Sequence, residues 1–487
     1  MNTNADITKK KSFRLTQVGN AKRLVARHGE NIRYCHEWKK WLIWNGKYWE
    51  VDTTNEIRRR AEDTIDNIYK EAKGKSDKTH KALISHANKS ETKRQLVDMV
   101  SLAGDDINVI VKSGDLDKDH WKLNVENGTI DLQTGKRRDH KREDYITKIA
   151  NAVYDNKAKC PTWDTFLDRI LEGNNSVIKF LQKAIGYSLT GDTSEQCLFF
   201  LYGKGANGKT TLLETISTML NDYAEQADFS TFLEQKNTIR NDLAGLKGAR
   251  FVPGVEAEKG KKFAEAFIKR VTGQDTVKAR FLYKEFFSFK PTFKVFLGAN
   301  HRPTIKGTDN AIWRRPILIP FNVEIPEDEM DKKIQPKFRK EMSGILNWAI
   351  KGCLTWQKEG LKEPEEIKHA KEQYRQDMDV LRGFLKDCCV LKSSAKVSSS
   401  DLYQAYNLWC QREDEEPITQ QQLGILLKER DLKPGHSGSI RHWKGIELNQ
   451  HTIEWMDATE YAEDIIKERQ EWEAEQNIIE ADKKSPF

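Results

Sequence analysis

The stretch Cys197-Leu198-Phe199-Phe200-Leu201-Tyr202-Gly203-Lys204-Gly205-Ala206-Asn207-Gly208-Lys209-Thr210-Thr211-Leu212-Leu213-Glu214 decides the fold of this chain. It begins as an apolar run of strand length, continues as G-x-x-x-x-G-K-T and ends with helical character. Glycines let the backbone curl so that its N–H groups, together with the positive end of a helix dipole, surround phosphate oxygens. The stretch therefore predicts a nucleotide-binding α/β fold.

Within this loop, the residue types indicate which groups bind ATP. The Lys209 ammonium is expected to neutralise the β- and γ-phosphates, and the Thr210 hydroxyl is expected to hold Mg²⁺. The alternative is a loop that only turns the chain, and it leaves the Lys-Thr pair in this register unexplained. The predicted nucleotide-binding residues are Gly203, Lys204, Gly205, Ala206, Asn207, Gly208, Lys209, Thr210 and Thr211.

A second predicted strand, within Ala249-Arg250-Phe251-Val252-Pro253-Gly254-Val255, leads to Glu256 and Glu258. One carboxylate is expected in the Mg²⁺ shell, with Glu256 the metal candidate, and the other is expected to polarise the attacking water. Pro253-Gly254 interrupts the strand pattern, so the division of roles stays open. The alternative is a pair of surface glutamates.

Two further segments complete the predicted catalytic set. The strand Phe293-Lys294-Val295-Phe296-Leu297-Gly298-Ala299 ends at Asn300, an amide suited to sensing the γ-phosphate or orienting water; the alternative is a turn residue. Arg314 and Arg315 precede the strand Ile317-Leu318-Ile319-Pro320-Phe321 and suit an arginine finger that reaches the ATP of a neighbouring subunit. The alternative is a surface pair that binds a phosphate or carboxylate.

Length and charge place this core in a larger protein. With 487 residues, about three domains are expected. The net charge is +7, but residues 452–487 hold eleven Asp and Glu against four Lys and Arg, so the rest carries +14. A basic body with an acidic tail suits a protein that binds nucleic acid and whose tail can compete with the nucleic acid for the basic surface. The alternative is a protein with a solvated C-terminal helix.

Several classes are excluded by what the sequence lacks. No stretch approaches about 18 uncharged apolar residues, and the N-terminus has no apolar signal core, so neither a membrane span nor secretion is expected. The seven Cys are odd in number and show no zinc-like spacing, so disulfides and a zinc site are not expected. A reducing, cytoplasmic environment is predicted.

The regions around the core also have readable patterns. Asn45-Gly46 and Asn127-Gly128 each predict a tight hairpin turn, and the four Trp of residues 38–49 are interpreted as hairpin core rather than base-stacking groups. Residues 55–104 and 327–379 have helical spacing. The segment 393–400 is rich in Ser and predicts a domain boundary, and residues 401–448 predict two helices followed by a β-wing.

Taken together, the P-loop, Glu256 and Glu258, the run 269–284, Asn300 and Trp313-Arg314-Arg315 resemble the superfamily 3 replicative helicases of phages, plasmids and satellite elements. The chain is similar to the helicase part of satellite-phage primase-helicases and of the poxvirus helicase-primase. The segments 124–132 and 160–163 resemble the N-terminal module of these proteins. The resemblance implies an AAA+ ring, usually a hexamer, that encircles DNA and translocates 3′→5′ on ATP.

The resemblance also places the DNA contacts. It implies a β-hairpin between the second and third strands, with Lys284 at its tip and Lys278, Arg280 and Lys290 on its arms; the alternative for Lys284 is a solvated turn lysine. Residues 380–450 resemble a winged helix whose Arg441, His442 and Lys444, with Lys428 and Arg430 nearby, suit duplex DNA, although winged helices also dock proteins. A convincing acidic triad of a primase is lacking, so a separate primase or polymerase is expected as a partner. The acidic C-terminal end, Ser485-Pro486-Phe487, is weakly similar to the end of single-strand-binding proteins.

The predicted fold is α/β, with an AAA+ P-loop core whose parallel sheet lies between helices. The predicted domains are an α+β accessory domain at 1–155, the ATPase at 156–375, a winged helix at 376–450 and an acidic helical tail at 451–487. The predicted function is a ring-shaped replicative helicase of a phage, plasmid or other mobile element in a bacterial cell, acting on single-stranded and forked DNA. The alternative is an ATP-switched origin-binding protein or helicase loader.

Overall fold

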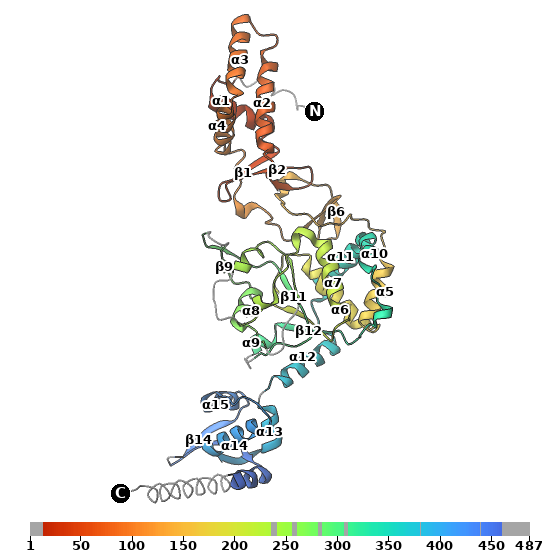
Figure 1. The fold of residues 1–487 in the computed structure, drawn as a ribbon, viewed down its shortest axis with the longest axis vertical. Helices are drawn as coiled ribbons and strands as arrows, with labels where there is room; N and C mark the ends of the chain where they lie inside the picture. The colour runs from red at the N-terminus through yellow and green to blue at the C-terminus, as the bar shows by residue number, and fades with distance from the viewer. Residues whose placement is uncertain are drawn as a thin grey trace, which may run out of the picture. The chain divides into compact units, whose positions relative to one another are not determined.

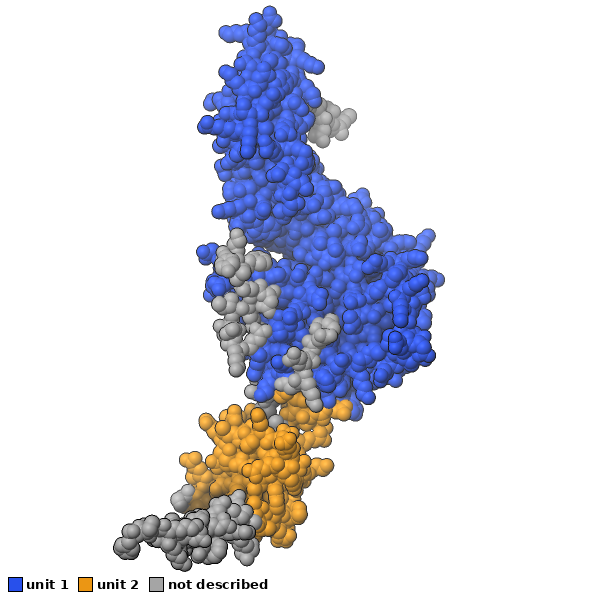
Figure 2. All heavy atoms as spheres, in the orientation of Figure 1, with its two compact units in different colours: residues 1–303, 314–370 blue, residues 304–313, 371–487 orange. Residues whose placement is uncertain are grey.

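The computed structural model describes residues 13–234, 241–255, 261–280, 285–305, 310–379, 381–438 and 440–459. They fall into two compact units, shown in Figure 2: unit 1 is residues 1–303 with 314–370, and unit 2 is residues 304–313 with 371–487. Within these described ranges, no helix is both long and apolar enough to cross a bilayer.

A four-stranded parallel sheet forms the centre of unit 1, in the order β12-β7-β11-β8. Each of these strands is predicted by an apolar run of the sequence. Because all four run in the same direction, their carboxyl ends meet at one edge, where ligands of open α/β sheets bind. The strands are β7 (Leu198–Tyr202), β8 (Phe251–Val255), β11 (Lys294–Ala299) and β12 (Pro316–Pro320).

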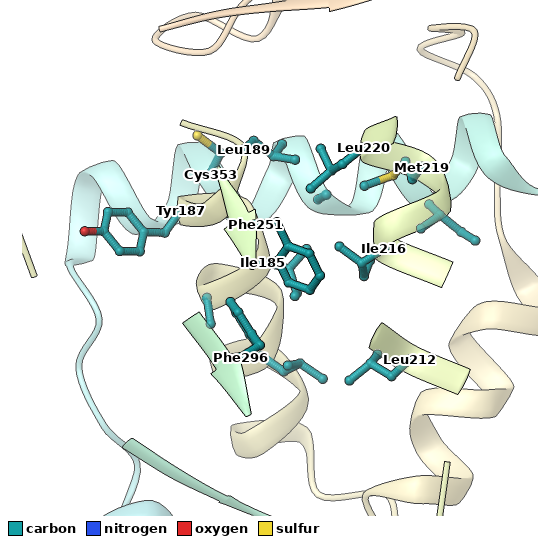
Figure 3. Close-up of a cluster of buried hydrophobic side chains, with 14 of the residues drawn as sticks. Ile185, Tyr187, Leu189, Leu212, Ile216, Met219, Leu220, Phe251, Phe296 and Cys353 are labelled. Carbon is teal, nitrogen blue, oxygen red and sulfur yellow. The ribbon is translucent and has the colours of Figure 1, made fainter. Parts of the chain in front are cut away.

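The main core of unit 1 lies between this sheet and helices α6 (Asn175–Ser188), α7 (Lys209–Leu220) and α11 (Met342–Glu359). Figure 3 shows Phe251 and Phe296, from neighbouring strands, directed toward side chains of α6 and α7. α6 and α11 cross with their backbones touching, because an added Cβ on Gly186 or Gly352 would lie only 2.0 or 1.9 Å from backbone atoms of the other helix. The remaining helices of this unit include α5 (Pro161–Ile170), α8 (Glu265–Thr272) and α10 (Ile334–Lys340), and α12 (Glu365–Asp377) runs from this unit into unit 2.

The expected interruption of β8 at Pro253-Gly254 is wrong. Both residues pair in register with β11, Pro253 opposite Phe296 and Gly254 opposite Leu297. On the other side of β8, the Ala227 N–H donates to the Pro253 carbonyl at 3.0 Å, an ordinary hydrogen-bond length. Proline is tolerated because β8 is the last named strand of the sheet, where a missing N–H costs little.

Helices and antiparallel strands make up the first part of unit 1, coloured red to orange in Figure 1. Its helices share a core that includes Leu24, Ile65 and Met99. They are α1 (Gln17–His28), α2 (Glu56–Ala72), α3 (Asp77–Ser90) and α4 (Lys93–Gly104). A three-stranded sheet between α1 and α2 is formed by β1 (Ile32–Cys35), β2 (Lys40–Trp44) and β3 (Trp49–Val51), and a second one after α4 by β4 (Lys122–Val125), β5 (Gly128–Asp131) and β6 (Lys136–Arg138).

Both hairpins exist, but their predicted turns are wrong in detail. Trp44 pairs with Trp49, so the first loop has four residues, held by the Asn45 Oδ1, which accepts from the N–H groups of Lys47 and Tyr48 at 2.9 and 3.0 Å. In the second hairpin Val125 pairs with Gly128, so the turn is Glu126-Asn127 and the glycine is already in the strand. The local Asn-Gly pattern indicates the location of each turn, while strand pairing sets its length.

The tryptophans of the first hairpin divide by burial. Trp49 is fully buried and Trp41 nearly so, and the Trp49 Nε1 donates to the Arg142 carbonyl at 2.8 Å. Trp38 and Trp44 are partly buried and pack against this cluster. These contacts support the interpretation of the tryptophans as hairpin core.

Unit 2 has a separate core that includes Phe384, Tyr406, Leu427 and Trp443. Its three-stranded antiparallel sheet has the order β13-β15-β14, and residues 450–459 form a further helix after it. The boundary expected at residues 393–400 is wrong, because the segment continues β13 and its Ser398 caps the next helix. The elements are α9 (Asn310–Trp313), α13 (Arg382–Cys388), β13 (Cys389–Ser398), α14 (Ser399–Arg412), α15 (Gln420–Lys428), β14 (Lys433–Ser437) and β15 (Ile440–Leu448).

Candidate active site

The glycine loop joins β7 to α7 and is fixed by its neighbours. Gly208 has φ +82°, and a Cβ there would lie 2.6 Å from the Ile170 Cγ2; a Cβ on Gly203 would lie 2.0 Å from the Phe321 carbonyl oxygen. Both positions therefore need glycine. The chain leaving β12 also binds the loop, because the Ile325 N–H donates to the Ala206 carbonyl at 2.8 Å.

Lys209 is buried at the start of α7, with its Nζ surrounded by neutral oxygens. It donates to the Gly203 carbonyl at 2.6 Å, to the Asn207 Oδ1 at 3.0 Å and to the Asn300 Oδ1 at 3.3 Å. Burial lowers the pKa of this ammonium to about 8. A buried cation whose described partners carry no negative charge is an electrostatic site for an anion.

A cavity of about 1110 Å³ opens beside this ammonium. The glycine loop, Thr210, Thr211 and the end of β11 form one wall, where the N-terminal N–H groups of α7 have no partners within the helix. A second wall comes from α5 and from residues 325–334, where Arg169 and Glu329 form an ion pair. Residues of that wall are Pro161, Thr162, Thr165, Phe166, Arg169, Ile325, Glu329, Met330, Asp331, Lys332 and Ile334.

No motif of the sequence predicts this second wall. Phe166 packs against the core with Trp163, at a ring-centroid distance of 5.6 Å, yet it also lines the cavity. Apolar periodicity marks the inward face of α5 but does not separate core contacts from cavity contacts. The loop residue Asn207 was predicted only by its place in the motif; its Nδ2 donates to the Phe321 carbonyl at 3.2 Å and so ties the loop to the end of β12.

The strand register places Asn300, the predicted sensor of the γ-phosphate, beside the glycine loop. Ala299 lies opposite Tyr202, so Asn300 follows at the same edge as the glycine loop and is exposed. Val255 lies opposite Gly298, so β8 ends at this edge too. Glu256 and Glu258 come directly after β8 and lie outside the described residues.

Arg314 and Arg315 are placed away from Lys209. They precede β12, whose first residue Pro316 lies opposite Leu198, the first residue of β7, so both arginines are at the sheet edge opposite the glycine loop. Arg314 is exposed and its Nη2 donates to the Gln196 Oε1 at 2.8 Å. Arg315 is only 6% exposed and its Nε donates to the Thr272 hydroxyl at 2.9 Å.

A hairpin lies between β8 and β11, as the resemblance implied. Its strands are β9 (Val277–Ala279) and β10 (Phe287–Phe289), with Lys278 opposite Ser288 on an exposed face. The Arg280 guanidinium is 4.8 Å from the ring centroid of Phe286, a side chain that is 62% exposed. Lys290 is exposed after β10, and Lys284 lies outside the described residues.

In unit 2, the predicted DNA-binding residues Arg441 and Lys444 are both on β15 and both exposed. The intervening His442 is buried, with 7% exposure.

Three family descriptions match this chain. "D5 N terminal like" matches residues 21–172, a family of unknown function matches residues 201–315, and "Poxvirus D5 protein-like" matches residues 376–433. The first covers the helices and hairpins that precede the glycine loop. The third covers the beginning of unit 2.

Viral proteins are similar over longer ranges. "Putative helicase L207/L206" of Acanthamoeba polyphaga mimivirus is 28% identical over 409 residues, which is 75% of this chain and 42% of that protein. "Putative helicase V13" of Sputnik virophage is 22% identical over 284 residues, 54% of this chain and 36% of that protein. "Primase D5" of Fowlpox virus is 27% identical over 135 residues, 26% of this chain and 17% of that protein.

The chain thus carries D5 N-terminal and poxvirus D5-like regions and is homologous to helicases and primases, so named, of viruses and a virophage. It spans less than half the length of each of these relatives. Among solved structures, the apo C terminal region of NrS-1 matches 89% of this chain with 9% identity and a TM-score of 0.45. The relatives come from viruses of eukaryotes, so a bacterial host stays a prediction.

Proposed function

We propose that this chain is the ATP-driven part of a replicative DNA helicase of a virus or other mobile element. The observation that carries the proposal is the buried Lys209 ammonium, held by neutral oxygens at the mouth of a 1110 Å³ cavity. Homology to viral proteins named as helicases supports DNA replication as the setting. The unwinding activity, the ring and the partners are part of the proposal.

The residues present fit ATP with Mg²⁺. Lys209 exchanges its bonds to the Gly203 and Lys204 carbonyls for bonds to β- and γ-phosphate oxygens, while the N–H groups of the loop and of the start of α7 bind the remaining phosphate oxygens. Thr210 and Glu256 are the residues that would hold Mg²⁺, which neutralises developing charge on the phosphates. Asn300, already beside Lys209, orients the attacking water or senses the γ-phosphate.

The position of the arginines supports a ring. Arg314 is exposed at the sheet edge opposite the glycine loop of its own chain, so a neighbouring subunit is the natural target of its guanidinium. Arg315 is buried and donates a hydrogen bond to Thr272, which suits a structural role in which it fixes the start of β12 to α8. We therefore assign the finger to Arg314. A hexamer follows from the family resemblance.

The hairpin supports a motor rather than a pure ATP switch. Lys278, Arg280 and Lys290 place positive charge on a projecting β9–β10 element, and phosphate contacts without base readout are what a translocating protein needs. Single-stranded and forked DNA are therefore the proposed substrates. In unit 2 the order helix, strand, two helices and a β-hairpin supports the winged-helix assignment.

A forked-duplex assay with purified full-length chain tests this proposal. We expect strand separation that requires ATP and a 3′ single-stranded arm, because the resemblance implies 3′→5′ movement. The alternative, an origin-binding loader switched by ATP, predicts ATP-dependent DNA binding with no displaced strand at any enzyme concentration. ATP hydrolysis that single-stranded DNA fails to stimulate, together with absent unwinding, would reject the helicase. A separate primase or polymerase and a single-strand-binding protein remain proposed partners.

A further inference from the structure

Three lysines form a row across the sheet of unit 2, here called the lysine row: Lys396, Lys444 and Lys433. In the strand register Lys396 on β13 lies opposite Lys444 on β15, and Lys444 lies opposite Lys433 on β14. Residues directly opposite on antiparallel strands project from the same face, with Cβ atoms about 4.5–5.5 Å apart. All three side chains are exposed.

The lysine row does nothing for the stability of the sheet. None of its three ammonium groups forms an ion pair with a residue that the structure describes. Like charges directly opposite each other destabilise a sheet. A row of three such charges is therefore explained better by an anion that binds across the strands than by the fold itself.

On one side of the lysine row, the next paired positions on this face carry no carboxylate. His442 lies opposite Ser398 on one side and Gly435 on the other. Its Nε2 is buried without a hydrogen-bond partner among the described residues, and a Cβ on Gly435 would lie 2.5 Å from that atom and 2.9 Å from the Lys444 Cε. Gly435 thus leaves room for both side chains, while Trp443, on the opposite face, packs into the core.

The helix that a winged helix would insert into the major groove has a different composition. In α15, Gln420-Gln421-Gln422-Leu423-Gly424-Ile425-Leu426-Leu427-Lys428, the single cation is Lys428 at the last position. Its exposed positions include Gln421 and Ile425. The positive charge of this unit therefore lies on the sheet rather than on the helix expected to read bases.

We propose that the lysine row is a nucleic-acid surface that binds backbone phosphates and does not read base sequence. Lysine is a point charge on a flexible stem, which binds phosphate without a fixed hydrogen-bond pattern. The inference rests on the proposed function for its biological setting and deepens it: unit 2 holds DNA through its sheet, with Lys396 and Lys433 joining the predicted Lys444. Binding itself requires no ATP.

The test is fluorescence anisotropy with full-length chain, without nucleotide, on a labelled duplex of arbitrary sequence and on one of its single strands. The variant K396A/K433A/K444A is compared with wild type between 50 and 200 mM salt. On the duplex we expect the slope of log Kd against log salt to fall by about 2.7, which removes roughly 40-fold of the affinity change over this range. On the single strand the decrease is expected to be about 2.1.

A matched variant controls for net charge. R375A/R382A/K386A removes three exposed cations from helices α12 and α13 of the same unit and is expected to keep most of the wild-type slope. Q421A is expected to change affinity less than twofold. Equal slopes for wild type and the lysine-row variant, equal losses in the two triple variants, or 100-fold discrimination between duplex sequences would each overturn the proposal.

Two further measurements separate causes of failure. An unfolding transition at or above that of wild type shows that the lysine-row variant folds, since removing like charges from a sheet does not destabilise it. K209A protein, which cannot hydrolyse ATP if the proposed function is right, is expected to retain the wild-type salt slope. If unwinding is absent but the lysine-row variant shows the expected decrease in salt slope, the helicase is rejected and this surface is not. If unwinding is present but the salt slope of the lysine-row variant equals that of wild type, this surface alone is rejected.

Discussion

Lys209 shows how one side chain can be arranged for a ligand. The residue is 7% exposed and the nearest partners of its ammonium are backbone carbonyls and amide oxygens, so desolvation is only partly offset. A phosphate supplies the missing negative charge. The folded protein therefore holds this cation at a cost that ATP binding relieves.

Replacing Lys209 by alanine tests this role. We expect K209A to lower the ATP hydrolysis rate at least 100-fold, since removing a single donor at a developing charge costs about 2.7–4 kcal/mol, and to abolish unwinding. The thermal transition should not fall, because a buried cation without a counter-charge is removed. K179A, at an exposed lysine of α6 that is not among the cavity-lining residues, serves as the control and should retain most of the activity. Wild-type turnover by K209A would remove the nucleotide-site assignment.

The lowered pKa of Lys209 gives a pH dependence. In the free protein this pKa is about 8, and adjacent phosphates raise it, so above pH 8 ATP binding takes up a proton. The Kd of a non-hydrolysable ATP analogue should be constant below about pH 7 and rise up to about tenfold per pH unit above pH 8. In K209R the guanidinium stays protonated, so its Kd, although weaker, should be flat over the same range. A wild-type Kd that is unchanged up to about pH 9.5 would contradict the proposed contact.

At the scale of elements, the two arginines that precede β12 differ in burial: Arg314 is exposed and Arg315 is buried. We expect R314A to bind ATP normally but to lose hydrolysis, because its exposed guanidinium acts on a neighbouring subunit, and R315A to lose about 1–3 kcal/mol of stability, since Thr272 loses a buried partner. Mixing R314A with K209A should restore partial turnover at interfaces that combine an intact finger with an intact loop. If subunits exchange and turnover is not restored, the finger does not act between chains.

The β9–β10 hairpin gives a second element-scale prediction. K278A/K290A should weaken binding to single-stranded DNA and reduce unwinding, while ATP hydrolysis without DNA stays near wild type, because these exposed lysines lie outside the cavity lining. The salt slope should become shallower by about 0.7 for each DNA phosphate that the hairpin no longer binds. K247A is a suitable control, since that lysine lies over the Phe287 ring at 5.3 Å rather than on the arms. Equal unwinding rates for wild type and K278A/K290A would show that the hairpin does not grip DNA.

The same elements show what the sequence could and could not predict. All four sheet strands were recognisable because parallel, doubly covered strands are continuous apolar runs, as in Leu198–Tyr202. Turn lengths and the continuity of β8 through Pro253 depend on which strand pairs beside them, and a local pattern does not contain that information. For the site, the loop motif predicted Lys209 and strand-end reasoning predicted Asn300 beside it, whereas the α5 wall, with Phe166, depends on tertiary packing.

For the whole molecule, each unit has its own hydrophobic core. The core of unit 1 includes Phe251 and Phe296 between sheet and helices, and that of unit 2 includes Phe384 and Trp443. Separate cores of this kind usually unfold as separate cooperative transitions. The nucleotide site and its cavity are built from residues of unit 1.

This division predicts at least two transitions in calorimetry of the full chain, one containing the nucleotide site of unit 1 and one containing the core of unit 2. A non-hydrolysable ATP analogue with Mg²⁺ at 100 times its Kd should stabilise unit 1 by about 2.7 kcal/mol and raise its transition, while the transition of unit 2 stays in place. K209A should abolish this shift. F384A, which empties a fully buried site in unit 2, should cost about 3–5 kcal/mol and lower only the other transition. A single transition that moves as a whole with both nucleotide and F384A would mean that the two cores unfold as one cooperative unit.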